Sequence, residues 1–214
     1  MSASLILAEC KRHGLLRNQA AYVLATAEHE TGGTFKPVRE TFAKTDAQAK
    51  ARLETAFKKG QLKWVKTPYW RDGFFGRGFV QLTHKYNYEN AGKKLGLDLV
   101  RRPSDAMKPN VAAQILVVGM KEGWFTGKKL SDYITLQKSS FKQARRIVNG
   151  MDRAAKIAAL AVKHDTALKA AGYGKTTSTA PIPPKRPETR SQGIISSLIA
   201  LLVQLITSIF GAKK

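Results

Sequence analysis

Helical periodicity is the feature of this chain that most constrains its fold. Small or apolar residues recur at spacings of three and four along most of the first 174 residues, and no alternating pattern persists beyond a few residues. Spacings of three and four place side chains on one face of an α-helix, whereas strict alternation is typical of a strand. The pattern therefore predicts a mainly α-helical domain with little or no sheet.

Eight helical segments are expected within this domain. Several end at a glycine, which readily takes the left-handed conformation that closes a helix, and Asn18 is expected to cap the second segment. The expected helices cover residues 4–13, 19–30, 44–62, 88–95, 110–122, 130–133, 141–148 and 154–171.

The composition changes after residue 174 and divides the chain into three parts. Residues 1–174 are long enough for one buried core, and residues 175–192 form a Pro-rich, basic linker. Residues 193–212 carry no charge and would measure about 30 Å as a helix, which matches the hydrocarbon thickness of a bilayer. We expect residues 193–214 to be an apolar helix that spans a membrane or lies on it; docking onto the domain or oligomerisation in water is the alternative.

The charge of the chain is strongly positive. Lys and Arg number 37 against 15 Asp and Glu, a net charge of +22, of which the first 174 residues carry +17. Anionic partners are therefore expected, whether nucleic acid, lipid or an acidic cell-wall polymer. Zinc-finger and RRM-like patterns are absent, which argues against specific nucleic-acid binding. The single cysteine, Cys10, excludes an intrachain disulfide and a Cys-rich zinc site.

Three glutamates stand out as candidates for acid and base chemistry. Glu28 and Glu30 are two residues apart, so on one helix they point in directions about 200° apart and cannot serve one site together. Glu30 falls at the expected helix end, where the helix dipole disfavours the ionised form and so suits a proton donor. The loop after it, with Gly32 and Gly33, could bring Glu40 back across a cleft. Taken singly, each glutamate is more often only a solvated surface residue.

Two separated motifs together resemble a known family. Residues 27–33 read Ala-Glu-His-Glu-Thr-Gly-Gly, and residues 75–88 read Phe-Gly-Arg-Gly-Phe-Val-Gln-Leu-Thr-His-Lys-Tyr-Asn-Tyr. In this order they resemble the signature of family 19 glycoside hydrolases, specifically the chitinase-like endolysins of phages and prophages. Shorter matches at residues 95–103, 123–127 and 147–150 extend the resemblance over roughly residues 15–172.

The resemblance implies a lysozyme-like, two-lobed helical fold that hydrolyses β-1,4 bonds next to N-acetylated amino sugars, without metal or cofactor. It assigns the general acid to Glu30, the general base to Glu40 and the water-positioning hydroxyl to Thr83. An inverting mechanism needs the two carboxyl groups about 6.5–9.5 Å apart. The positions matching substrate-contacting residues are Gln81, Tyr86, Asn87, Asn149 and Arg153. Three aromatic residues could also stack on sugar rings or serve as ordinary wall or core residues, namely Trp64, Tyr69 and Trp70.

Three functions remain open at this point. The first is an endolysin that cleaves peptidoglycan and lyses bacteria; its charge would concentrate it on anionic envelope polymers or lipids. The second is a chitinase acting on chitin or chito-oligosaccharides, and the third is a non-enzymatic, membrane-active basic protein on a dead hydrolase fold. No cleavable signal peptide is visible, so we expect synthesis in the cytoplasm of a bacterial host, action at the cell envelope, and membrane association through the C-terminal helix.

Overall fold

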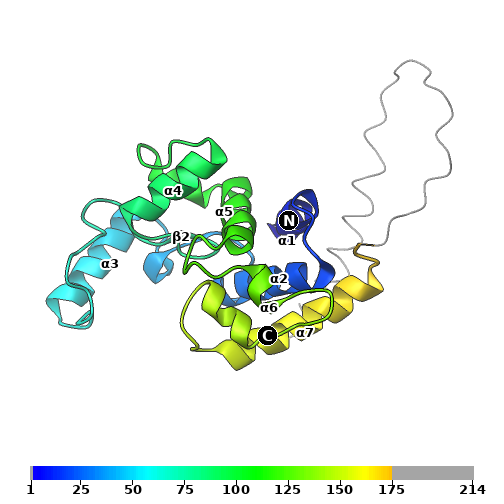
Figure 1. Ribbon diagram of the computed structural model, residues 1–214. Coiled ribbons are helices and arrows are strands. Elements are labelled where there is room, and N and C mark those ends of the chain that lie inside the picture. Colours follow the sequence, from blue (N-terminus) through cyan, green and yellow to red (C-terminus); the bar gives the residue numbers. More distant parts are fainter. Residues whose placement is uncertain (1, 175–214) are drawn as a thin grey trace, which may run out of the picture.

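The computed structural model describes residues 2–174, and this part of the chain is mainly helical (Figure 1). The expectation of a mainly α fold is confirmed. The predicted linker, residues 175–192, and the predicted apolar helix, residues 193–214, lie outside the described residues. The helices are α1 (Ser2–Arg12), α2 (Arg17–Glu30), α3 (Asp46–Lys58), α4 (Lys85–Leu95), α5 (Pro109–Glu122), α6 (Leu130–Tyr133) and α7 (Ala154–Ala170), with 3-10 turns η1 (Glu40–Phe42), η2 (Pro103–Met107) and η3 (Gln143–Ile147).

Several of the expected helices differ from the structure: α3 is shorter than the expected 44–62, and α4 begins three residues before the expected start at 88. The segment expected at residues 141–148 contains the 3-10 turn η3 instead of an α-helix. Helix α2 begins earlier than expected, because its cap is Leu16, whose backbone N–H donates to the Gln19 side chain. Asn18 does not cap the helix: its amide donates to the Thr135 carbonyl and the Ser139 hydroxyl, both at 2.8 Å. The Asn18 side chain therefore forms long-range hydrogen bonds to residues 135 and 139 instead of a local helix cap.

The main hydrophobic core forms around α2. This helix packs along α7, and α1 packs against α5 (Figure 1). Residues 20–27 of α2 are all buried, so the helix is surrounded on every side and its last residues emerge at the edge of the core. An ion pair from Arg17 to Asp165 at 2.8 Å also joins α2 to α7. The end of α2, which carries Glu30, is thus held on a rigid element.

A second, smaller core lies under α3. Its buried members are Ala43, Ala49, Leu53, Trp70 and Phe75, separate from the main cluster. Thr45 begins α3 by accepting the backbone N–H of Gln48 at 3.1 Å, an ordinary N-cap. The two cores give the domain the two-lobed character that the sequence predicted.

A two-stranded antiparallel sheet lies against the η2 turn and α5. Strand β1 (Val38–Arg39) pairs with β2 (Arg77–Gly78), with Val38 opposite Gly78 and Arg39 opposite Arg77. The pair fixes the segment before Glu40 against the Gly-rich loop. Within residues 2–174, every helix is too short or too polar to cross a bilayer.

Candidate active site

Glu30 lies at the last position of α2 and faces a buried arginine. The side chain of Arg145 is only 3% exposed, and its Nη1 donates to Oε1 of Glu30 at 2.8 Å. The other oxygen, Oε2, makes no hydrogen bond within residues 2–174. Glu30 is itself one-fifth exposed, so one oxygen is anchored to the protein and the other is free to face a ligand.

Arg145 is held from its other side by the segment before α7. Its Nε donates to the backbone carbonyl of Asp152 at 3.2 Å, and its Nη2 lies 3.6 Å from the Asp152 carboxylate. The guanidinium therefore joins α2 to the start of α7. The sequence did not single out Arg145, because it belongs to a run of basic residues and is 115 positions from Glu30.

Glu28 points away from this group, as its spacing from Glu30 predicts. Its carboxylate lies 2.6 Å from Nε2 of the buried His164 on α7. Between the two glutamates, burial lowers the pKa of His29, and Glu30 only partly opposes that effect. We expect His29 to be neutral at pH 7. Glu28 thus contributes to the packing of α2 on α7, and Glu30 alone faces outward at the site.

Glu40 follows strand β1 and is held by donors at both carboxylate oxygens. The hydroxyl of Tyr69 donates to Oε1 at 2.6 Å, and the backbone N–H of Gly76 donates to Oε2 at 2.7 Å. Burial, and then the hydrogen bond to Glu40, raise the pKa of Tyr69 well above its usual value, so the phenol keeps its proton and donates. Donors at both oxygens suit an ionised carboxylate.

The Gly-rich loop places a backbone donor where a side chain would crowd Gln81. A Cβ atom built on Gly76 would come within 2.5 Å of Oε1 of Gln81. Gln81 in turn donates from Nε2 to the Val38 carbonyl at 3.0 Å, which ties the loop to the strand before Glu40. The backbone of Gln81 has a φ of +54°, a left-handed conformation that is costly for a residue with a Cβ.

Thr83 and Asn87 continue the same wall of the site. The Thr83 hydroxyl donates to the Gln81 carbonyl at 2.6 Å, and the Asn87 amide donates to the Thr83 carbonyl at 2.7 Å. Tyr86 is 64% exposed, and its ring stacks on His84 with the centroids 6.2 Å apart. Consecutive hydrogen bonds thus join Gln81, Thr83 and Asn87, and Gln81 also bonds to strand β1, which precedes Glu40.

Asn149 and Arg153 lie in the segment that holds Arg145, the partner of Glu30. The backbone N–H of Asn149 donates to the Arg145 carbonyl at 3.1 Å, and its side chain accepts the N–H of Gly150. Arg153 begins α7 with a φ of +57° and is exposed. Its side chain makes no hydrogen bond or ion pair inside the described part of the chain. The arginine that contacts a proposed catalytic carboxylate is therefore Arg145.

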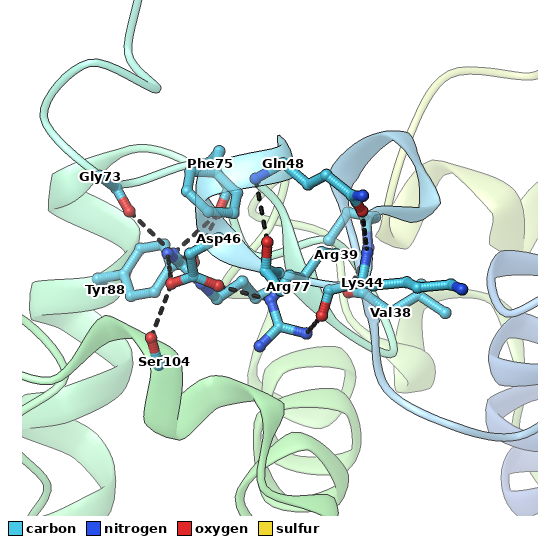
Figure 2. A network of polar contacts seen from close by, with 12 residues as sticks. Val38, Arg39, Lys44, Asp46, Gln48, Gly73, Phe75, Arg77, Tyr88 and Ser104 are labelled. Atoms are coloured by element: carbon cyan, nitrogen blue, oxygen red, sulfur yellow. Dashed lines mark hydrogen bonds and ion pairs between the residues drawn. The ribbon is translucent and has the colours of Figure 1, made fainter. Parts of the chain in front are cut away.

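A buried charge network supports the strand that leads to Glu40 (Figure 2). The side chain of Arg77 on β2 is 1% exposed and lies 3.7 Å from the ring centre of Phe75. Asp46, at the start of α3, accepts from Arg77 at 2.7 Å and from Ser104 at 2.8 Å, and its other oxygen accepts from Arg39. One carboxylate therefore joins α3, both strands and the η2 turn.

The site presents two glutamates from different elements. One is at the end of a buried helix, and the other is beside a Gly-rich loop whose walls carry amide and hydroxyl groups. Most glycoside hydrolases use a pair of carboxyl groups that flank the glycosidic bond. The fold and the site together therefore match that class of protein.

Comparison with known proteins identifies the family. The family model for class I chitinases, glycoside hydrolase family 19, matches residues 10–128. This match covers more than half of the chain, so the chain belongs to that family. Both carboxylates and the whole Gly-rich loop fall inside the matched region, whereas Arg145, Asn149 and Arg153 fall beyond it.

Individual relatives match shorter segments. Chitinase 11 of Oryza sativa subsp. japonica is 67% identical over 30 residues, which is 14% of this chain and 12% of that protein. An endochitinase of Arabidopsis thaliana is 36% identical over 81 residues, 37% of this chain and 27% of the relative. The crystal structure of chitinase C from Streptomyces griseus HUT6037 superimposes with a TM-score of 0.46 at 23% identity, covering 70% of this chain and 57% of that chain. This chain spans only 12% to 27% of the curated relatives it matches.

Proposed function

We propose that this protein is a peptidoglycan-cleaving endolysin that hydrolyses β-1,4 glycosidic bonds with inversion of configuration. Glu30 is the general acid and Glu40 the general base, with Thr83 positioning the attacking water. Gln81, Tyr86, Asn87, Asn149 and Arg153 are proposed to contact the glycan. The proposal includes no metal or cofactor.

The observation that carries the proposal is the different anchoring of the two carboxyl groups. Glu30 has one oxygen fixed by Arg145 and one oxygen with no hydrogen-bond partner among residues 2–174, which leaves that oxygen to hold a proton for the leaving group. Glu40 has a donor at each oxygen, and each oxygen keeps a lone pair that can accept a proton from water. Glu30 thus presents one oxygen that a substrate can reach, and Glu40 keeps the capacity to accept a proton from water.

The acid step and the water attack would occur together in this mechanism. Glu30 protonates the glycosidic oxygen as the bond to the anomeric carbon breaks. Glu40 removes a proton from a water that attacks the opposite face of the sugar ring, so the products are a reducing sugar and a free hydroxyl. This requires the carboxyl groups of the two residues to be about 6.5–9.5 Å apart.

The charge of the protein supports a cell-envelope substrate. The first 174 residues carry +17, which would concentrate the enzyme on anionic wall polymers or lipids and would give no advantage on neutral chitin. We propose that the protein acts at the envelope of a bacterial host, with residues 193–212 promoting membrane association. Chitin is the second candidate substrate, because the curated relatives are named as chitinases.

Mass spectrometry of the soluble products would test the proposal. Wild-type protein is incubated with purified peptidoglycan and, separately, with chitin oligosaccharides. The proposal predicts muropeptides with a newly formed reducing end from peptidoglycan, and the sugar at that end identifies the bond. The Glu30→Gln and Glu40→Gln variants should lose at least about 100-fold in kcat, as expected for removal of a general acid or base. Equal product release by wild type and both variants would rule out the proposed mechanism.

A matched control is available on the same helix. Glu28→Gln removes a neighbouring carboxylate that faces His164, so it should affect stability more than kcat. Products from chitin alone would favour the second candidate substrate.

A further inference from the structure

A pocket beside Glu40 is left unassigned by the proposed mechanism. It has a volume of about 610 Å³, and Tyr69 and Thr83 form part of its wall. Tyr69 also donates to Glu40, so the pocket adjoins the proposed catalytic base. Its remaining wall includes Trp64, Lys66 and Asp72.

Asp72 is unusual among the acidic residues of the protein. Every other Asp and Glu within residues 2–174 has an ion pair or a hydrogen bond to a described residue, whereas Asp72 has neither. The chain has 37 basic and 15 acidic residues. A carboxylate without a cationic partner is therefore unexpected on electrostatic grounds. Its charge is available to a ligand.

Lys66 supplies the opposite charge on the same pocket. It is exposed and has no ion-pair partner in the part of the chain that the structure describes. Trp64, two residues earlier, is 76% exposed, although indole rings are usually much more buried. The pocket therefore combines a free cation, a free anion and an uncovered aromatic surface.

This combination suits a zwitterionic ligand better than a neutral sugar. A chitin residue carries no formal charge and would leave Lys66 and Asp72 unused. The peptide branches of peptidoglycan carry carboxylates and amines on short, partly apolar residues, which can pair with both charges and cover the indole. The pocket volume is sufficient for a ligand of that size.

We propose that this pocket binds the peptide branch of peptidoglycan and thereby determines the substrate preference of the enzyme. Lys66 pairs with a peptide carboxylate, Asp72 pairs with a peptide amine, and Trp64 covers the apolar part. The inference rests on the proposed hydrolase function and extends it to substrate class.

The test compares one glycan with and without its peptides. Rates are measured on intact peptidoglycan and on the same strands after an amidase has removed the peptides. Lys66→Gln and Asp72→Asn should each lower kcat/KM on the intact material about tenfold, which corresponds to loss of one charge-assisted contact. On the stripped strands, both variants should match wild type within about twofold.

The Asp72 variant separates specific recognition from general attraction. Asp72→Asn increases the net positive charge, so general attraction to an anionic wall predicts an equal or faster rate, whereas peptide binding predicts a slower one. For lysine, the matched control is Lys63→Gln, which removes an equal charge on the same loop outside the pocket lining. Lys66 and Asp72 are both exposed, so the melting temperatures of the two variants should stay close to that of wild type.

Two results would overturn the inference. One is wild-type behaviour of both pocket variants on intact peptidoglycan. The other is an equal loss on intact and stripped strands, which would assign the pocket to a sugar ring. If neither wild type nor Glu30→Gln cleaved either material, the proposed hydrolase function itself would fail.

Discussion

Each proposed catalytic glutamate depends on a partner that is distant in sequence. Arg145 is 115 positions from Glu30, and Tyr69 is 29 positions from Glu40. Residue type, spacing and family resemblance identified the two carboxylates. They could not identify Arg145, because nothing in a run of basic residues marks the one arginine that becomes buried. The two candidate carboxylates could thus be named from the sequence, but the partners that anchor them could not.

Replacing Arg145 by lysine should impair turnover more than binding. Lysine keeps the positive charge, but its single ammonium cannot reproduce the forked contacts to Glu30 and the Asp152 carbonyl. We expect kcat to fall about tenfold or more, with little change in KM, in steady-state assays on a soluble glycan. Arg146→Lys is the matched control, because the Arg146 side chain is exposed and donates to Gln143, three residues earlier. Equal activity of the two variants would contradict the positioning role of Arg145.

At the scale of elements, the short sheet joins the segment before Glu40 to the Gly-rich loop. Register places Arg39 opposite Arg77, so the strand that precedes Glu40 is bound to the loop whose Gly76 donates to that glutamate. Two-residue strands are too short to produce an alternating pattern, so no periodicity could predict them. The helices other than the four-residue α6 were predictable because each extends over several turns.

The Asp46 carboxylate should be a major support of this sheet. Asp46→Asn would leave the buried Arg77 without its anionic partner, and we expect a loss of about 2–4 kcal/mol in the free energy of unfolding. Urea denaturation would measure this loss. Ser104→Ala removes only one neutral donor to Asp46 and should cost about 1 kcal/mol. A loss from Asp46→Asn no larger than that from Ser104→Ala would argue against the network.

The lowered pKa of Asp46 predicts how the stability of the whole molecule responds to acid. Burial alone would raise the pKa of Asp46, but hydrogen bonds from Arg77, Arg39 and Ser104 outweigh it and hold the pKa well below its usual range. Hydrogen bonds from Arg71 and Trp70 lower the pKa of Glu54 to about 2. As the pH falls, the unfolded chain therefore binds protons first, at about pH 4, and stability present above that pH is lost below it.

Urea titrations from pH 7 to pH 2 would check this response. Wild type should lose stability progressively below about pH 4, and Asp46→Asn should lose less over the same interval because one of the responsible groups is gone. Parallel curves for the two proteins would show that Asp46 does not contribute to the acid response.

The net charge of the molecule predicts a dependence on ionic strength. If the +17 carried by residues 1–174 attracts the enzyme to an anionic wall, then raising salt from about 0.05 M to 0.5 M should slow digestion of intact peptidoglycan several-fold, because the Debye length shortens. A neutral chito-oligosaccharide should be cleaved at a nearly constant rate. A similar salt dependence on both substrates would contradict electrostatic recruitment.

The central claim is that Glu30 and Glu40 act as acid and base on opposite faces of the sugar. Proton NMR of the first product formed from a soluble β-1,4 glycan tests it most directly, before the anomers equilibrate. We predict that the α-anomer appears first and that it is absent with Glu40→Gln. Initial release of the β-anomer would contradict the inverting mechanism and the assignment of Glu40 as a base that activates water.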